Sequence, residues 1–156
     1  MSSVRDQVVA KAVALLNGAG KPAGLPVADR ARTFDLDEAD YPAQLVYWTQ
    51  DPEERIGGPS GPLQRHDVVL VVESYAKGDA TTGADEAADP IVSWAVKALA
   101  DPAAFGASPE GKRLVTGIKV LGSEADYKQG RWALCSVATL FGVDFQSRVD
   151  DATLVE

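Results

Sequence analysis

Cysteine and histidine are almost absent from this sequence of 156 residues, which holds one of each, Cys135 and His66. A single cysteine excludes an intramolecular disulfide and leaves no thiolate cluster for zinc or an iron–sulfur group. We expect Cys135 to be a small buried apolar side chain in a strand, since free cysteine is mostly used that way. The sequence therefore predicts no metal and no cofactor.

Basic residues are also few: 15 Lys and Arg stand against 23 Asp and Glu, a formal net charge of −8. Nucleic-acid affinity depends on Lys and Arg displacing counterions from phosphates, so we expect no tight nucleic-acid binding. An acidic surface would instead suit a place where DNA must pass without sticking. The chain also lacks an apolar run long enough for a membrane span or a signal-peptide core, which predicts a cytoplasmic protein with no membrane contact.

The remaining composition is that of a folded domain, with 46% hydrophobic and 24% charged residues. The length fits a single domain over 1–156, with a flexible C-terminal tail from about residue 147. An amphipathic helix is predicted over residues 3–17, ended by Asn17-Gly18, and a second helix begins at Asp89-Pro90, a capping Asp followed by Pro at the first helical position. Strands are predicted at 25–33, 43–49, 66–75, 114–121 and 131–145, with a turn at 122–127.

The element order is thus α-β-β-β-α-β-β. Consecutive strands joined by loops favour antiparallel pairing, so we expect an α+β domain with a mostly antiparallel four- to five-stranded sheet and both helices on one face. Two long polar loops, 50–63 and 76–88, are the predicted contact regions. Their candidate contact residues are Asp51, Glu53, Glu54, Arg55, Lys77, Asp79 and Asp85.

The strand Val68–Val72 has no polar face, because alternate side chains point to opposite sides and all five are apolar. Both sides therefore need a cover. Either the helices and long loops wrap both faces of the sheet, or a second chain covers one of them. The second alternative makes Val69, Val71, Tyr47 and Trp132 candidate subunit-interface residues.

Three motifs invite a catalytic or ligand-binding interpretation, and each is incomplete. The stretch Gly106-Ala107-Ser108-Pro109-Glu110-Gly111-Lys112-Arg113 matches a phosphate-binding loop up to its lysine, but Arg113 replaces the Ser or Thr that binds magnesium. The acidic run 35–40 lacks the Gly and Glu of a calcium loop. His66 is followed by Asp67, but neighbouring strand residues face opposite sides, so Asp67 is poorly placed to orient the imidazole, which we expect to be exposed or at an interface.

The whole pattern resembles the tail terminator proteins of long-tailed bacteriophages. The resemblance runs through Leu15-Leu16-Asn17, Tyr41-Pro42-Ala43-Gln44-Leu45-Val46-Tyr47-Trp48, Arg65-His66-Asp67-Val68-Val69-Leu70-Val71-Val72-Glu73, Asp89-Pro90-Ile91-Val92-Ser93-Trp94-Ala95-Val96-Lys97-Ala98-Leu99 and Phe141-Gly142-Val143-Asp144-Phe145.

The resemblance implies a structural virion protein without catalytic residues, assembled in the host cytoplasm. It would form a hexameric ring on the last ring of the tail-tube protein, stop tail polymerisation, present a surface to the head connector proteins and leave a channel for DNA. Two alternatives stay open: another phage neck or tail-completion protein, and a small hydrolase or ligand-binding domain that uses His66 with loop carboxylates.

Overall fold

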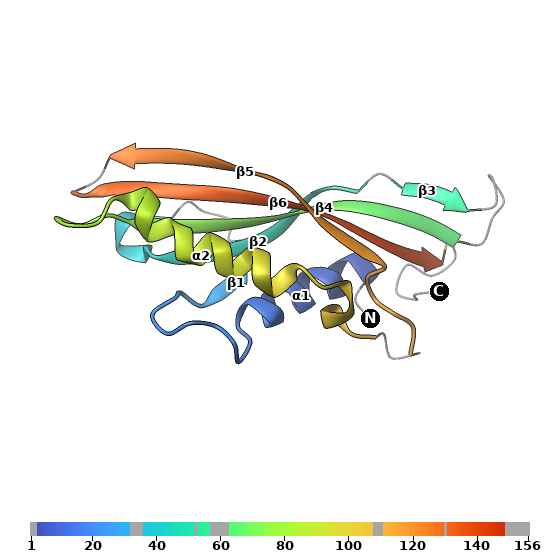
Figure 1. Ribbon diagram of the computed structural model, residues 1–156. Coiled ribbons are helices and arrows are strands. Elements are labelled where there is room, and N and C mark those ends of the chain that lie inside the picture. The colour runs from blue at the N-terminus through green and yellow to red at the C-terminus, as the bar shows by residue number, and fades with distance from the viewer. Residues whose placement is uncertain are drawn as a thin grey trace.

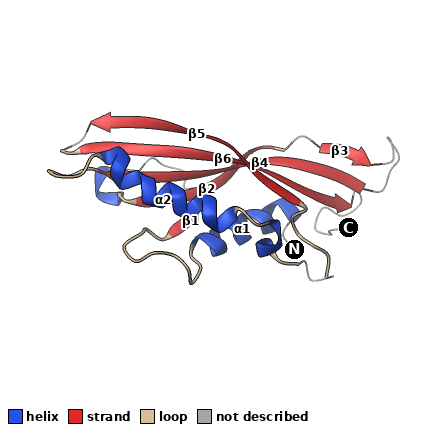
Figure 2. Ribbon diagram, in the orientation of Figure 1, coloured by secondary structure: helices blue, strands red, loops and turns tan. Residues whose placement is uncertain are grey.

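A computed structural model describes residues 3–31, 36–51, 53–56, 63–107, 111–129 and 131–148. Within them, a twisted six-stranded sheet carries both α-helices on one of its faces, and the other face has no α-helix on it (Figures 1 and 2). The predicted α+β class and the placement of the two helices are confirmed. The sheet has more strands than expected and contains one parallel pair.

The strands follow the spatial order β1, β2, β4, β6, β5 across the sheet. Their bounds are β1 (Ala28–Arg30), β2 (Ala43–Gln50), β3 (Glu53–Ile56), β4 (Leu63–Lys77), β5 (Gly117–Gln129) and β6 (Ala133–Arg148). β1 pairs in parallel with β2, whereas every other pairing is antiparallel, and β3 pairs with the first residues of β4. The long strands β4 and β6 pair along their whole length and form the centre of the sheet.

Helix α1 (Val4–Leu16) matches the predicted helix 3–17. Ser3 caps its N-terminus, with the Ser3 hydroxyl accepting a hydrogen bond from the Asp6 N–H. At the other end, the Asn17 side chain accepts from the N–H of Ala28 at 2.8 Å and donates to its carbonyl at 2.9 Å. The residue that ends α1 therefore also attaches strand β1.

Helix α2 (Ala84–Leu99) begins five residues before the predicted start at Asp89-Pro90, so that prediction is wrong. The Ala-rich turn before Pro90 carries Asp85 and Glu86 near the positive end of the helix, which favours helix there. Pro90 falls inside the helix instead of at its first position. The indole N–H of Trp94 donates to the carbonyl of Leu16 at 2.8 Å, which confirms the core position predicted for Trp94 and connects the two helices.

The hydrophobic core lies between the helices and the sheet. The sheet supplies alternate buried residues of β4 and β6, and the helices supply their apolar stripes; the central members are Val8, Ala12, Leu16, Val68, Leu70, Val72, Leu99, Phe105, Phe141, Val143 and Phe145. Phe105 comes from the short helix η2 (Pro102–Phe105). Cys135 is buried in a smaller cluster with Ala76, Ala88 and Ile91, as expected, and burial raises its pKa.

Several predicted loops are shorter than expected because strands, and in one case helix α2, extend into them. β3 occupies part of the predicted loop 50–63, and the residues between β4 and α2 are 78–83 alone. The predicted turn 122–127 lies inside β5, where a bulge at Leu121 and Gly122 interrupts the register with β6. β6 continues to Arg148, so the tail predicted from about 147 overlaps the strand, and 149–156 lie outside the described residues.

Candidate assembly face

The face of the sheet that carries no α-helix is the candidate functional surface, and we call it the open face (Figure 2). Because directly opposed residues share a face, the strand registers identify its members. The central ones are Leu45, Tyr47, Val69, Val71, Glu73, Tyr75, Ala138 and Leu140, with Asp67, Asp144 and Lys119 toward the other end. The open face thus has an apolar centre, with Glu73 within it and the pair Asp67 and Asp144 farther along.

Three of the four candidate interface residues lie together at this centre. Tyr47 is directly opposite Val71, Val71 is opposite Leu140, and Val69 is opposite Gly142. Val71 is only 4% exposed although no helix covers it, because its neighbours on the sheet surround it closely. The fourth candidate, Trp132, lies apart in the turn between β5 and β6 and is 39% exposed.

Glu73 is the charged residue within this apolar centre, and two tyrosines hold it. The Tyr47 hydroxyl donates to Glu73 Oε1 at 2.6 Å, and the Tyr75 hydroxyl donates to Oε2. Tyr41 packs edge-on against Tyr75 with a centroid separation of 5.3 Å. Burial, and then the bond to Glu73, raise the pKa of both Tyr47 and Tyr75, so these donors keep their protons. A partner covering this part of the face would leave neither hydroxyl unsatisfied.

A second ionisable pair lies farther along the open face, where Asp67 of β4 is directly opposite Asp144 of β6. Burial raises the pKa of Asp144, and the charge of Asp67 and a side-chain hydrogen bond with it raise it further, while Arg65 and Lys119 act in the opposite direction. Like charges directly opposed across a strand pair are destabilising. This pair is therefore a locally destabilising contact on the open face.

His66 points to the helix-covered side, and it is buried, so the expectation of an exposed or interface histidine is wrong. Its Nδ1 lies 2.9 Å and 3.0 Å from the two carboxylate oxygens of Asp51, and its Nε2 lies 2.7 Å from the Ser147 hydroxyl oxygen. The imidazole stacks on Phe145, with centroids 4.6 Å apart. Asp67 does not orient His66, as the strand alternation predicted; Asp51 does.

Asp51 in turn binds α1. The Arg5 guanidinium donates to Asp51 Oδ2 at 2.8 Å and lies 4.0 Å from the ring centroid of Trp48. The order carboxylate, imidazole, hydroxyl matches that of a nucleophilic triad, but the hydroxyl of Ser147 belongs to a residue that is 1% exposed. A substrate cannot reach it in this structure. The chain of contacts ties the first turn of α1 to β2, β4 and β6.

The remaining candidate contact residues occupy different surroundings. The Asp51 side chain is turned inward, 3% exposed, and Glu53, Glu54 and Arg55 lie in β3, where the side chains are outside the described part of the structure. Asp85 is exposed in the first turn of α2. Asp79 is exposed in the turn before α2, where its carboxylate accepts from the N–H groups of Thr81 and Thr82, and these bonds lower its pKa.

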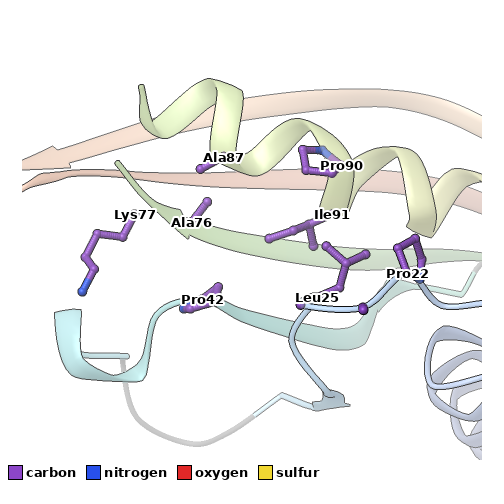
Figure 3. Close-up of a pocket in the computed structure, with 10 residues that line it drawn as sticks. Pro22, Leu25, Pro42, Ala76, Lys77, Ala87, Pro90 and Ile91 are labelled. Atoms are coloured by element: carbon purple, nitrogen blue, oxygen red, sulfur yellow. The ribbon is translucent and has the colours of Figure 1, made fainter. Parts of the chain in front are cut away.

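Lys77, the last residue of β4, lies at the rim of a groove of about 390 Å³ on the helix side of the sheet (Figure 3). The groove is mainly apolar and is lined by Pro22, Ala23, Gly24, Leu25, Pro42, Ala76, Ala87, Pro90 and Ile91. Leu25 of the loop after α1 and Ile91 of α2 approach each other across it (Figure 3). Among the described residues that line it, Lys77 is the one titratable group.

The other sequence motifs give no ligand geometry. The stretch 106–113 follows η2 and precedes β5, the reverse of a phosphate-binding loop, and its residues 108–110 lie outside the described part. The described portion of the acidic run forms the short helix η1 (Glu38–Asp40). In the described ranges, no three His, Cys, Asp or Glu side chains gather as a metal site would require. No helix there has the length and apolar character to cross a membrane.

Comparison with known proteins gives distant likenesses among solved structures. No family model matches the chain, and no curated protein matches it. Among solved structures, a chain from the virion of a native gene transfer agent particle is similar with a TM-score of 0.42 and 17% identity, over 93% of this chain and 92% of that one. At this TM-score the match stands as a likeness only, and the chain's own geometry has to support any function.

Proposed function

We propose that this chain is a structural subunit of a phage-like particle, namely a tail terminator. In this role it assembles as a hexameric ring, caps the tail tube, stops tail polymerisation and offers a joining surface to the head connector. The chain acts by assembly and not by catalysis. Its location is the virion neck, after assembly in the host cytoplasm.

The observation that carries this proposal is the open face. Both α-helices lie on one side of the sheet, so the apolar centre formed by Tyr47, Val69, Val71 and Leu140 has no helix over it. An apolar surface of this kind marks a contact with another chain. The hydrogen bonds from Tyr47 and Tyr75 to Glu73 also suit the open face to burial under a partner, because the Glu73 carboxylate already has two donors.

The charge balance supports a ring through which DNA passes. With a net charge of −8, the chain has no excess of Lys and Arg with which to hold phosphates. A channel wall built from such subunits would repel the genome instead of retaining it. The sequence resemblance to tail terminators supplies the specific assignment.

Electron microscopy of tail tubes polymerised with this chain tests the proposal. We expect tubes of defined length with a ring at one end, and Val71→Asp should abolish the rings because it places a charge at the centre of the open face. Ala10→Asp is the matched control: Ala10 is exposed on α1, on the helix-covered side of the sheet, and the variant should still cap. Unchanged tube length and bare tube ends with the wild-type chain would refute the function.

Two alternatives are separated by other observations. Another neck component would bind the portal-side ring, and genes for the tube and tape-measure proteins lying just downstream would favour the terminator instead. A hydrolase or ligand-binding domain using His66 is disfavoured by the enclosure of its partner Ser147. That alternative requires His66→Ala to remove an activity while the fold stays intact.

A further inference from the structure

The two edges of the sheet differ in whether their backbone groups are occupied. At β1 the Ala31 N–H donates to the carbonyl of Val46 in β2, so in a parallel ladder Ala28 and Arg30 turn their backbone groups outward. Both outward N–H groups are already bound: Asn17 holds that of Ala28, and the Asp29 carboxylate accepts from that of Arg30 at 2.8 Å. Asn17, which binds both backbone groups of Ala28, thus seals this short edge against another strand, whereas the carboxylate of Asp29 is a local acceptor that a partner could replace.

The other edge, β5, is long and mostly open. Its Tyr127 N–H donates to the Asp126 carboxylate at 3.0 Å and not to β6, which identifies Tyr127 as an outward position. The alternation of an antiparallel ladder, corrected for the bulge at Leu121, then turns the backbone groups outward at Ile118, Val120, Ser123, Ala125 and Tyr127. Such a row of unpaired groups is a template for another strand.

Apolar side chains gather on the same element. Among the described residues, four of the six large hydrophobic side chains with high exposure belong to β5 or the turn after it: Val120, Leu121, Tyr127 and Trp132. From Lys119 to Gln129 every residue of β5 is exposed, whichever side of the sheet it faces. This strand thus contributes little burial to the monomer and has much to gain from a partner.

The charges of β5 select the partner. On the open-face side, the strand carries Lys119 before the bulge and Glu124, Asp126 and Lys128 after it. An antiparallel copy of the same strand can place Lys119 opposite Asp126, and two-fold symmetry makes this contact twice. We propose that β5 pairs antiparallel with β5 of a second copy of this chain, with Lys119 facing Asp126 across the two-fold axis.

The backbone fits the same register on either side of the bulges, while at the centre Ser123 lies opposite Gly122, an inward position, so the ladder is interrupted there. The register places Ile118 opposite Tyr127 and Val120 opposite Ala125 of the second copy, and all four positions turn their backbone groups outward. Tyr127 and Val120 are covered by the contact. In the monomer the Asp126 carboxylate accepts from the Tyr127 N–H. In the dimer this carboxylate binds the Lys119 ammonium of the second copy instead, and the Tyr127 N–H donates to a backbone carbonyl of the second copy's strand. If the second strand slides by two residues in one direction, Lys128 comes opposite Lys119, which is repulsive. If it slides in the other direction, Glu124 comes opposite Lys119 and the paired stretch becomes shorter.

Complementary charge reversals test the contact and its register together. Lys119→Asp alone creates two Asp–Asp oppositions in a homodimer, and Asp126→Lys alone creates two Lys–Lys oppositions. Each variant should dimerise at least about tenfold more weakly than the wild type in sedimentation velocity. Mixed in equal amounts, however, the two variants regain both opposite-charge contacts and should form a one-to-one heterodimer, which also shows that both are folded.

Lys97→Asp, a charge reversal on the exposed side of α2, serves as the control and should dimerise like the wild type. Recovery when Lys119→Asp is mixed with Glu124→Lys, but not with Asp126→Lys, would overturn this register. Wild-type dimerisation by both single variants, or a wild-type chain that is monomeric in solution, would overturn the strand contact. The ring proposal is judged separately, because it is read from tube ends and from Val71→Asp.

Discussion

Removing the charge of Asp144 should stabilise the protein at neutral pH. Asp144 lies directly opposite Asp67, and its pKa is raised above the ordinary 3.8 by burial first and by Asp67 second, net of the opposing Arg65 and Lys119. The folded state therefore binds more protons than the unfolded state between pH 3.8 and the folded pKa. The free energy of unfolding that this group contributes is fully present below pH 3.8 and is lost as the pH rises through the folded pKa.

Asp144→Asn does not titrate and removes the repulsion. Opposed like charges on a strand pair cost about 0.2–1 kcal/mol, so we expect a gain of that size at pH 7, or a rise in Tm of up to about 4 °C for a domain of this length. At pH 3 the gain should vanish, because the raised pKa of Asp144 leaves that carboxyl largely protonated in the wild type. Urea unfolding at both pH values measures the difference, with the linear extrapolation applied to each.

Two further variants sharpen this test. Asp67→Asn should give a similar gain at pH 7, and the double variant should gain less than the sum, because both substitutions remove the same interaction. Glu124→Gln, on the exposed strand β5 and directly opposite Ala138, removes one negative charge without an opposed carboxylate and should leave stability nearly unchanged. A loss of stability for Asp144→Asn at pH 7, or an equal gain at pH 3, would refute the reasoning.

Three other substitutions report on burial and on polar satisfaction. His66→Ala should lower the free energy of unfolding by about 2–4 kcal/mol in urea titrations, since it leaves the buried groups of Asp51 and Ser147 without their shared partner; an unchanged midpoint would contradict this role. Glu73→Ala should cost about 1–2 kcal/mol by leaving two tyrosine hydroxyls without an acceptor, and Glu73→Gln, which keeps an acceptor, should cost less. Phe141→Ala should cost about 3–5 kcal/mol in the same assay, because Phe141 is 1% exposed in the core.

Periodicity predicted the elements whose burial is one-sided or complete. The stripe of α1 and the apolar strand around Val68–Val72 were identified correctly because their side chains meet the core in the repeat that the backbone imposes. The start of α2 was missed for a local reason. Asp89-Pro90 is a strong start signal, and the apolar stripe before it, Ala84, Ala87 and Ala88, consists of alanines alone, which mark a buried face only weakly.

The C-terminal part of β5 could not be predicted from the sequence. Both of its faces are exposed, so neither alternation nor a continuous apolar run marks it beyond Leu121. Gly122-Ser123 reads locally as a turn, while in the fold Gly122 takes a φ of 150° at a bulge and the strand continues. Pairing with β6 determines this element, and a pairing partner is not visible in the strand's own residues.

The open-face centre could be predicted because it follows from alternation alone, whereas the polar contacts could not. Tyr47 and Glu73 are 26 residues apart, and Asp51 reaches His66 only because β3 folds back onto β4. The contact between Asp51 and His66 had one clue in the sequence: His66 is the single histidine of the chain, so a carboxylate partner for it could have been considered. The carboxylate that binds it stood in a segment predicted to be a contact loop.

The sealing of β1 by Asn17 limits how the molecule can polymerise. A subunit with open strands at both edges is bifunctional and can extend a sheet without end, as a fibre does. With β1 closed, each subunit can extend the sheet through β5 alone. Extension through these two edge strands therefore stops once the β5 strands of two subunits have paired. A closed ring of this chain therefore cannot be a continuous sheet through β1.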